Sequence, residues 1–537
     1  MNKRLVLLLA ALASALGAAD SGGQLRFAIQ AEPRTFDPHL VNEDASGMVR
    51  FLTAGVLIRL NRQTQKPEPE LAQSWKVGQG GRTITLQLRE NITFSNGSPF
   101  TAEDAVFSIQ RVSDPKNLSP VGDSLRAGGQ PPQAKVTGKY SLSVRFAAAV
   151  PNCERLFDDL AMVSALAPAD PRVALGPFLV KEYKAGSHLL LERNPRYWKK
   201  DAQGKALPYL ASIRVEIQRN RDMEMLKFRR GELHLIQNLD PDGFSRLQNA
   251  GAEDLGVSLN LEMVWFNQAP QAALPAYKKA WFQSREFRQA VSEAVNRDDI
   301  ARIVFKGHAT PAPGPVSPGN QFWSLKSLPP PFRSPQAALA RLRKAGFSLR
   351  GGQLYDPTGQ PVEFSIITNA GNKSRERMAS LVRQDLGALG MRVNVVTLDF
   401  PSLIERISKT GQYEACLLGF VYNDLDPNSQ MNIWLSSSGT HPWNPGQKKP
   451  ATPWEAEIDR LIVAQAAEPD PIKRKATFDR VQQIVVDQAA VTCLVYKNAL
   501  LAVQPGVKNV KPVVLPPNAL WNVERLYLEG DALRASR

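Results

Sequence analysis

Hydrophobic residues recur with two different spacings along this chain, and the repeated switch between them constrains the fold more than any other feature. Residues 83–89 alternate apolar and polar side chains, which is the pattern of a strand with one buried face. Within residues 284–296, Phe287, Val291 and Val295 recur at four-residue steps, which places them on one face of a helix. No period of about 20–50 residues repeats, so a solenoid or a propeller is excluded. The chain is therefore predicted to mix α-helices and β-strands.

A strand, a helix and a second strand follow one another within residues 362–398, and this order predicts a parallel pair with a right-handed crossover. Residues 415–421 and 490–496 are predicted to be further strands. Residues 311–335 are rich in proline and are predicted to be a long ordered loop or a wrapping segment. With 537 residues, the length fits about two to four domains or lobes. We expect two α/β lobes, the first of them discontinuous and completed by the C-terminal tail.

The N-terminus carries the pattern of a cleavable export signal. A positive pair, Lys3 and Arg4, precedes an apolar run and then small residues up to Ala19. The apolar run is too short to span a bilayer, which takes about 20 residues, although an uncleaved anchor is the alternative. We expect cleavage after Ala18 or Ala19, so that residues 1–19 are a signal peptide and the mature protein works in the periplasm or at the extracellular face of the cell envelope. No cysteine lies near the end of the signal, so no lipid-anchor cysteine is expected.

Neither a metal site nor a disulfide framework is indicated. The three cysteines, Cys153, Cys416 and Cys493, are sparse, odd in number and spaced too widely for a metal knuckle. One disulfide is possible, and the sequence does not select its pair. The five histidines are scattered, and none belongs to a local pair of metal ligands. We expect no metal and no cofactor.

Basic residues outnumber acidic ones, which gives a formal net charge of +15, or +13 once Lys3 and Arg4 are removed. This excess would favour an anionic surface or an acidic solute, but a general solubility charge is the simpler interpretation. The basic residues are scattered, and no basic helix carries interleaved aromatic residues. No nucleic-acid partner is therefore expected.

Several short motifs occur in order over residues 31–297. They are Ala31-Glu32-Pro33-Arg34-Thr35-Phe36-Asp37-Pro38, Leu71-Ala72-Gln73-Ser74-Trp75, Phe94-Ser95-Asn96-Gly97-Ser98-Pro99-Phe100-Thr101-Ala102-Glu103-Asp104, Gly176-Pro177-Phe178 with Leu191-Glu192-Arg193-Asn194-Pro195-Arg196-Tyr197-Trp198, Gly231-Glu232-Leu233-His234, and Phe287-Arg288-Gln289-Ala290-Val291 with Asn296-Arg297. In this order they resemble the extracellular solute-binding proteins of peptide-type ABC importers, including the periplasmic oligopeptide and dipeptide receptors. Local structure also explains some of them, because Asn96-Gly97 predicts a tight turn and Thr101 with Asp104 predicts a capping box.

The resemblance implies a two-lobed periplasmic-binding-protein-like α/β fold of the large peptide-receptor type, with an extra subdomain in the first lobe. The expected division is a first lobe at residues 20–260, with an inserted subdomain at about 50–170, and a second lobe at 261–492. Residues 493–537 are expected to return to the first lobe. Strands near 258–266 and 493–500 would then be the hinge between the lobes.

The stretch Gly419-Phe420-Val421-Tyr422-Asn423-Asp424-Leu425-Asp426-Pro427 matches the family segment Gly-Trp-x-x-Asp-x-x-Asp-Pro, along which the peptide lies in these receptors. The candidate ligand-binding residues are therefore Gly419, Phe420, Val421, Tyr422, Asn423 and Asp424. Gly419 would let a ligand approach the backbone. Asn423 stands where the family has the aspartate that takes the ligand's ammonium, and it offers only a neutral carbonyl oxygen. Either Asp424 supplies the charge instead, or the ligand has no free amine at this point. Asp426-Pro427 is predicted to be a turn that fixes the exit of the strand.

Two first-lobe residues complete the candidate site. Glu32 and Arg34 match positions that line the peptide site in the resemblance, and Arg34 would pair with a ligand carboxylate. The alternative is a solvated loop.

The resemblance implies a receptor without enzymatic activity, which captures a short peptide by lobe closure and delivers it to the membrane permease of an ABC importer. A monomer is expected. A second hypothesis keeps the scaffold but binds an oligosaccharide or another amine-free solute, with Tyr422, Trp323 and Trp434 stacking on sugar rings. A third is a secreted hydrolase that uses paired carboxylates, although Asp158-Asp159 and Asp298-Asp299 are expected to face water and no hydrolase motif occurs.

Overall fold

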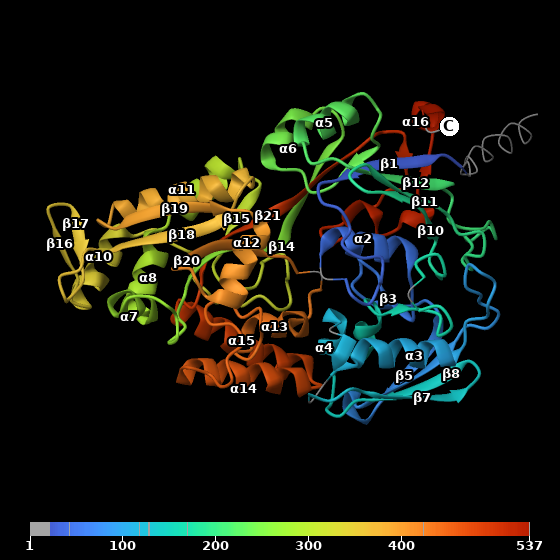
Figure 1. Cartoon of the computed structure of the whole chain (residues 1–537), viewed down its shortest axis with the longest axis horizontal. Coiled ribbons are helices and arrows are strands. Elements are labelled where there is room, and N and C mark those ends of the chain that lie inside the picture. The colour runs from blue at the N-terminus through green and yellow to red at the C-terminus, as the bar shows by residue number, and fades with distance from the viewer. Residues whose placement is uncertain are drawn as a thin grey trace, which may run out of the picture.

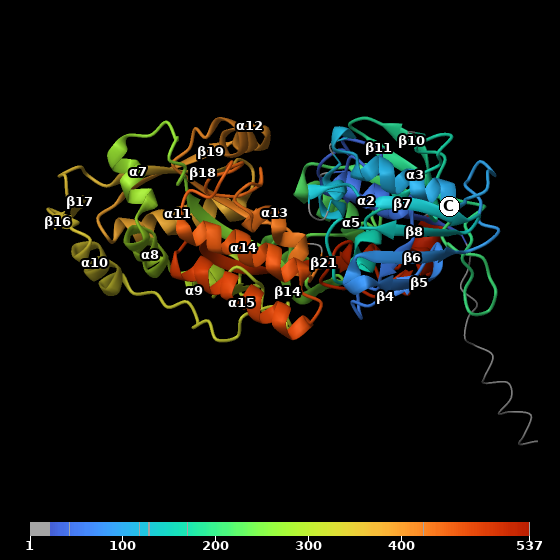
Figure 2. The same ribbon diagram turned by 90° about the horizontal axis from the view of Figure 1, so that it is seen from below.

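The computed structural model describes residues 22–41, 43–117, 119–126, 129–168, 170–422 and 424–535. The predicted signal peptide at residues 1–19 and the candidate residue Asn423 both lie outside this described part of the chain. Figure 1 shows two bodies side by side. We call the body with the N-terminal strand, in blue, cyan and red, the first lobe, and the body in yellow and orange the second lobe. Figure 2 shows the same two bodies from below. The expected two-lobed α/β fold is confirmed.

One mixed sheet runs through both lobes. Among the described residues, eleven strands form it, in the order β10-β11-β12-β1-β13-β21-β14-β20-β18-β19, with β15 beside β21. These strands are β1 (Gln24–Ile29), β10 (Phe178–Lys184), β11 (His188–Arg193), β12 (Ser212–Ile217), β13 (Leu235–Ile236), β14 (Ala252–Phe266), β15 (Ala309–Pro311), β18 (Glu363–Asn369), β19 (Arg392–Leu398), β20 (Ala415–Phe420) and β21 (Thr492–Val503). The long antiparallel pair β14 and β21 connects the lobes (Figure 1).

Helices and the C-terminal tail cover the first-lobe part of the sheet. These elements are α2 (Asp44–Thr53), α5 (Arg221–Arg229), α6 (Pro241–Leu247), β22 (Val507–Lys508), the 3₁₀ helices η8 (Asn518–Leu520) and η9 (Val523–Arg525), β23 (Tyr527–Leu528) and α16 (Gly530–Ala535). Leu25 and Phe27 of β1 are buried in one cluster with Leu520 and Leu526 of the tail. The tail therefore packs on the first lobe after the chain leaves β21.

A smaller body within the first lobe has its own sheet, of order β5-β6-β8-β7, and its own apolar core. Its elements are β2 (Gly55–Val56), β3 (Ile58–Leu60), β4 (Pro67–Pro69), β5 (Ala72–Gly78), η1 (Gln79–Gly81), β6 (Thr83–Leu88), α3 (Ala102–Ser113), η2 (Pro115–Asn117), α4 (Pro120–Leu125), β7 (Gln133–Gly138), β8 (Ser141–Arg145), η4 (Cys153–Phe157) and β9 (Ala161–Met162). The predicted capping box of α3 is confirmed. The Thr101 side chain accepts a backbone N–H of the first turn, and the Asp104 side chain accepts the backbone N–H of Thr101.

In the second lobe, the predicted strand–helix–strand unit is confirmed. β18 and β19 are parallel, and α11 (Lys373–Gly387) connects them. The other elements are α7 (Ala276–Gln283), α8 (Arg285–Ala294), α9 (Arg297–Asp299), η5 (Ile300–Val304), α10 (Pro335–Lys344), β16 (Ser348–Arg350), β17 (Gln353–Tyr355), α12 (Phe400–Glu405), η6 (Arg406–Thr410), η7 (Pro427–Gln430), α13 (Met431–Trp434), α14 (Pro453–Ala467) and α15 (Pro471–Asp487). Proline in the first turn begins several of them, where the missing N–H costs nothing.

The sheet of the second lobe is buried on both faces. Along β14, Val264 and Phe266 belong to one apolar cluster, whereas Met263 and Trp265 belong to another. Successive strand residues point to opposite faces, so these two clusters lie on the two sides of the sheet. Such double burial explains why β20 is apolar along its length rather than alternating.

The three cysteines are free and buried, so the disulfide that the sequence left open does not form in this structure. Within the described residues, no helix is long and apolar enough to cross a membrane.

Candidate functional site

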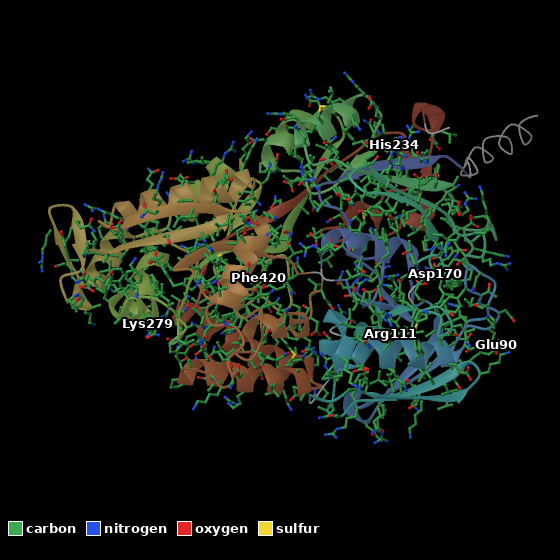
Figure 3. The ribbon with its side chains drawn as sticks, viewed as in Figure 1. Glu90, Arg111, Asp170, His234, Lys279 and Phe420 are labelled. Carbon is green, nitrogen blue, oxygen red and sulfur yellow. The ribbon has the colours of Figure 1, made fainter. Side chains whose placement is uncertain are left out.

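The candidate segment begins inside the large sheet, directly beside the connection between the lobes. Gly419 and Phe420 are the last residues of β20, and they pair with Glu262 and Leu261 of β14. On its other side β14 pairs with β21, so β20 lies directly beside one of the two connecting strands and one strand away from the other. After Phe420 the chain leaves the sheet. Figure 3 places Phe420 in the second lobe, on the side nearer the first lobe, and Arg111 and Asp170 in the first.

Gly419 makes room for a carboxylate of the protein itself. A Cβ atom at this position would lie 2.7 Å from Oε2 of Glu262. That carboxylate is buried, with its Oε2 2.9 Å from Nε of Arg375 and its Oε1 3.7 Å from Nζ of Lys497. Burial raises the pKa of Glu262, but the two cations outweigh burial and hold the pKa below its usual value. From the sequence alone, this glycine was expected to let a ligand approach the backbone.

The charges around Gly419 extend into the first lobe through Asp44, at the start of α2. Burial and neighbouring Glu43 raise the pKa of Asp44, whereas Lys497 lowers it. Lys497 thus interacts both with a first-lobe carboxylate and with buried Glu262. Neither Asp44 nor Lys497 belongs to a motif, so the sequence did not indicate either of them. The available signal was the acidic pair at the start of a helix, which also has a simple capping explanation.

The next three residues differ sharply in exposure. Phe420 is half-buried and stacks on Trp265, with 6.2 Å between the ring centroids. Val421 is 47% exposed, whereas Tyr422 is 5% exposed. No hydrogen-bond partner of the Tyr422 hydroxyl is present within the described part of the chain. Of these three residues, Val421 is the one that is open to solvent.

Asp424 forms an ion pair with the first lobe. Nε of Arg155, on η4, lies 3.3 Å from Oδ2 of Asp424, and a terminal nitrogen of the same guanidinium donates to Oδ1. Another terminal nitrogen donates to the carbonyl oxygen of Gln65 at 3.1 Å. Burial lowers the pKa of Arg155, but the carboxylate of Asp424 outweighs burial and raises it. The lobes are therefore in direct contact at the candidate segment.

Asp426 and Pro427 form the predicted turn, which is confirmed. The Asp426 carboxylate accepts the backbone N–H of Asn428 and caps η7, in which Pro427 is the first residue. The same carboxylate is bound by Arg474, whose two terminal nitrogens lie 2.5 and 2.6 Å from its oxygens. Arg474 is almost fully buried, so this pair is part of the interior of the second lobe.

Glu32 and Arg34 lie in the first lobe, before α2. The Glu32 carboxylate accepts a hydrogen bond from the Tyr183 hydroxyl at 2.7 Å and from the backbone N–H of Gly186 at 3.0 Å, which ties it to the hairpin of β10 and β11. The Tyr183 hydrogen bond is the main cause of the lowered pKa of Glu32. Arg34 is exposed, and its backbone N–H donates to Ser46 of α2. Within the described residues, neither side chain contacts the segment 419–424 through a hydrogen bond or an ion pair.

The residues expected to stack on sugars are mostly interior. Trp434 is 1% exposed and Trp323 is 7% exposed, and both belong to one apolar cluster of the second lobe together with Tyr422. Arg474 lies 5.0 Å above the Trp323 ring. Packing therefore explains these two tryptophans.

One expectation about carboxylates is wrong. Asp158 does not face water but is buried, with Oδ2 2.8 Å from a terminal nitrogen of Arg62 and Oδ1 3.5 Å from Arg59. Its neighbour Asp159 is more exposed and pairs with Arg50 at 2.6 Å. The two carboxylates thus point to different partners, which does not suit a shared catalytic role.

No cluster of residues suited to hold a metal ion is found among the described residues. Two cavities lie on the second lobe, away from the candidate segment. One, of about 610 Å³, is lined by α11 and η5, and the other, of about 400 Å³, lies beside β18 and η6. Their lining residues include none from the first lobe, so they do not report on the contact between the lobes.

Comparison with known proteins identifies the kind of molecule. The sequence model for bacterial extracellular solute-binding proteins, family 5 Middle, matches residues 66–442. A protein of Deinococcus radiodurans named as a probable ABC transporter-binding protein is 26% identical over 518 residues, which cover 87% of this chain and 86% of that protein.

Two solved structures illustrate the similarity of fold. The oligopeptide-binding protein AppA from Bacillus subtilis, in complex with a nonapeptide, aligns with a TM-score of 0.77 at 21% identity, over 96% of this chain and 100% of that chain. The periplasmic binding protein MelB from Agrobacterium fabrum C58, in complex with stachyose, aligns with a TM-score of 0.75 at 20% identity, over 96% of this chain and 86% of that chain. The same fold is thus found with a peptide in one case and an oligosaccharide in the other.

Proposed function

Because this chain belongs to family 5 of the bacterial extracellular solute-binding proteins, we propose that it captures a short peptide between its two lobes and delivers it to the membrane permease of an ABC importer. The observation that carries the proposal is the position of the segment 419–424. It leaves the sheet one strand away from β21, and its last residue touches the first lobe through Arg155. A solute held along this segment would therefore contact both lobes.

Closure would occur by bending of β14 and β21. Their pairing is irregular between Asp254 and Val257 and again between Val257 and Leu261. Such bulges leave residues unpaired and increase local bending, so this stretch can absorb a change of angle between the lobes. The lobe boundaries near residues 260 and 492 are part of this proposal.

The proposed ligand-binding residues are those of the second-lobe segment, the two first-lobe residues Glu32 and Arg34, and the charged residues Asp44 and Lys497. They are Gly419, Phe420, Val421, Tyr422, Asn423, Asp424, Glu32, Arg34, Asp44 and Lys497. Exposed Val421 follows the last paired residue of β20, so its backbone is suited to continue the ladder with a peptide. Backbone hydrogen bonds of this kind would bind peptides of varied side chains.

The receptor would bind without covalent chemistry and without a cofactor, as a monomer. The expected export signal at residues 1–19 would place it outside the cytoplasmic membrane, in the periplasm or at the cell surface, where it meets the permease. Support for a peptide comes from AppA, which shares the fold and holds a nonapeptide.

A second candidate is an oligosaccharide or another amine-free solute. One observation favours it: the carboxylate of Asp424 is already paired with Arg155, so the segment offers no unpaired negative charge there. MelB, which shares the fold, holds stachyose. A hydrolase is the remaining alternative.

Mass spectrometry of solutes that co-purify with the protein, followed by thermal shifts with a peptide library and an oligosaccharide panel, tests the proposal. A ligand at about 100 times its Kd should stabilise the folded protein by about 2.7 kcal/mol. Co-purified peptides and a shift with peptides alone are expected. A shift with stachyose alone would favour the second candidate, and turnover of a bound compound would favour the hydrolase.

A matched pair of variants tests the binding edge. Val421→Pro removes one backbone N–H, whereas Val421→Ala keeps it and shortens an exposed side chain. We expect Val421→Pro to weaken peptide binding by about three- to tenfold, because one hydrogen bond contributes about 0.5–1.5 kcal/mol. Equal affinities of the two variants would contradict the proposed edge.

A further inference from the structure

We propose that Arg155 determines specificity at the candidate site: its guanidinium occupies the carboxylate of Asp424, locks the lobes together there, and leaves no room for a ligand's ammonium group. The inference rests on the proposed function for its ligand, but the lock between the lobes does not depend on which solute binds. The chemical class that fits is a solute that is neutral where it meets this segment, such as a peptide with a blocked amino terminus.

The first support is the geometry of the ion pair. The planar guanidinium presents two parallel nitrogens to the two oxygens of Asp424, which is the strongest arrangement of an arginine–carboxylate pair. The side chains of Arg155 and Asp424 are 16% and 25% exposed, so water screens their charges only in part. The two residues are 269 positions apart and belong to different lobes.

The second support is that the first lobe holds Arg155 in place. Its neighbours Cys153 and Phe157 on η4 are fully buried in the apolar core of the smaller body within the first lobe. A third nitrogen of Arg155 is fixed by the carbonyl oxygen of Gln65. The guanidinium is therefore positioned by its own lobe, and less side-chain freedom is lost when the lobes meet.

The third support is that the second lobe prepares Asp424. Its Oδ1 accepts the backbone N–H of Asp426 at 3.1 Å. Together with the two bonds from Arg155, the carboxylate then has three donors. A carboxylate has about four acceptor sites, so little capacity remains for an ammonium group with three N–H donors.

The fourth support comes from the other acidic groups near the segment. Asp426 is bound by Arg474, and Glu262 is bound by Arg375. Each of these carboxylates is thus engaged by a group of the protein. An ammonium group brought to the second-lobe edge would lose its hydration without gaining an unpaired carboxylate, which is unfavourable.

Small-angle X-ray scattering of the protein after removal of solutes by unfolding and refolding tests the lock without any ligand. Arg155→Gln and Asp424→Asn should each reduce the ratio of closed to open molecules by about fivefold, within the range of typical coupling energies. The double exchange Arg155→Asp with Asp424→Arg should restore much of that ratio. The control is Arg172→Gln, which breaks an exposed pair with Asp170 in the first lobe. Single variants that scatter as the parent does would overturn the lock.

Calorimetry with one peptide, as the free amine and as the N-acetyl form, tests the specificity. The parent should bind both forms within about threefold, whereas Arg155→Gln should favour the free amine by about tenfold, because it frees the charge of Asp424. A parent that already prefers the free amine by about tenfold, with no change in Arg155→Gln, would overturn the specificity role. If no peptide binds the parent, the proposed peptide function fails, while the scattering result still decides the lock.

Discussion

Removal of the Asp426 carboxylate should destabilise the second lobe more than most single changes in this protein. The substitution Asp426→Ala leaves the guanidinium of Arg474 without its charged partner. Arg474 is 1% exposed, and its remaining hydrogen bonds are from Nε to the carbonyl and side-chain oxygens of Gln465, at 3.0 Å each. The cation stays buried because Trp323 and the start of α15 enclose it.

The expected loss follows from two contributions. Breaking a buried ion pair by removing one partner costs about 3–5 kcal/mol, since an uncompensated charge remains inside. Asp426 also caps η7 through the N–H of Asn428, and loss of such a cap costs about 1 kcal/mol. The free energy of unfolding of the second lobe should therefore fall by about 4–6 kcal/mol.

Urea unfolding followed by tryptophan fluorescence measures this loss, because Arg474 lies over the Trp323 ring and Trp434 belongs to the same apolar cluster as Trp323. The matched control is Asp170→Ala, which removes an exposed ion pair and should cost at most about 1 kcal/mol. The double variant Asp426→Leu with Arg474→Met should be more stable than Asp426→Ala, because no buried charge is left unpaired. A loss below about 1 kcal/mol in Asp426→Ala would refute the reasoning.

Three further outcomes follow from the structure. Gly419→Ala places a Cβ 2.7 Å from Oε2 of buried Glu262 and should cost about 1–3 kcal/mol in urea unfolding, whereas Gly387→Ala, with open space around the new Cβ, should cost nothing. Burial lowers the pKa of His39 to about 4, so protonation of His39 favours the unfolded chain. As the pH falls from 6.5 to 4, this effect should lower the free energy of unfolding by about 3 kcal/mol. The variant His39→Gln should lack this part of the pH dependence. The three buried cysteines should resist a thiol reagent in the folded protein and react fully in guanidinium chloride; fast labelling of the folded protein would contradict their burial.

Local signals in the sequence were sufficient for much of the fold. The turn at Asn96-Gly97 forms as predicted, with Gly97 at a φ of 89° and its N–H bonded to the carbonyl oxygen of Phe94. The capping box of Thr101 and Asp104 also forms, because its bonds join residues within one helical turn. Such features depend on neighbours in the chain, which is why a single sequence indicates them.

Contacts between residues far apart in the chain could not be predicted from a single sequence. Asp158 was expected to face water, but it pairs with Arg62, 96 positions earlier. Arg155 lies in a short irregular helix with no motif around it, so nothing in the sequence linked it to Asp424. Gly419 was expected to let a ligand approach the backbone, whereas a Cβ there would meet the carboxylate of Glu262. A single sequence could not show that Glu262 lies opposite Gly419 in the sheet.

The positions of the ionic contacts between the lobes suggest which of them controls closure. One group joins Asp242 of α6 to Lys306 at 2.7 Å and to Arg377 at 3.0 Å, and these side chains are 35–49% exposed. Exposed pairs contribute about 0–1 kcal/mol each. Moreover, α6 packs against β21 and β14, close to the axis about which the lobes would turn, so a rotation moves this group little.

The pair of Arg155 and Asp424 joins η4 of the first lobe to the segment that follows β20 in the second lobe. Its side chains are 16% and 25% exposed, so water screens this pair less than it screens the Asp242 group. Opening of the lobes would return both of its charges to water. The energy of this second pair is gained only in the closed arrangement, so it shifts the equilibrium between open and closed forms, whereas the Asp242 group stabilises both.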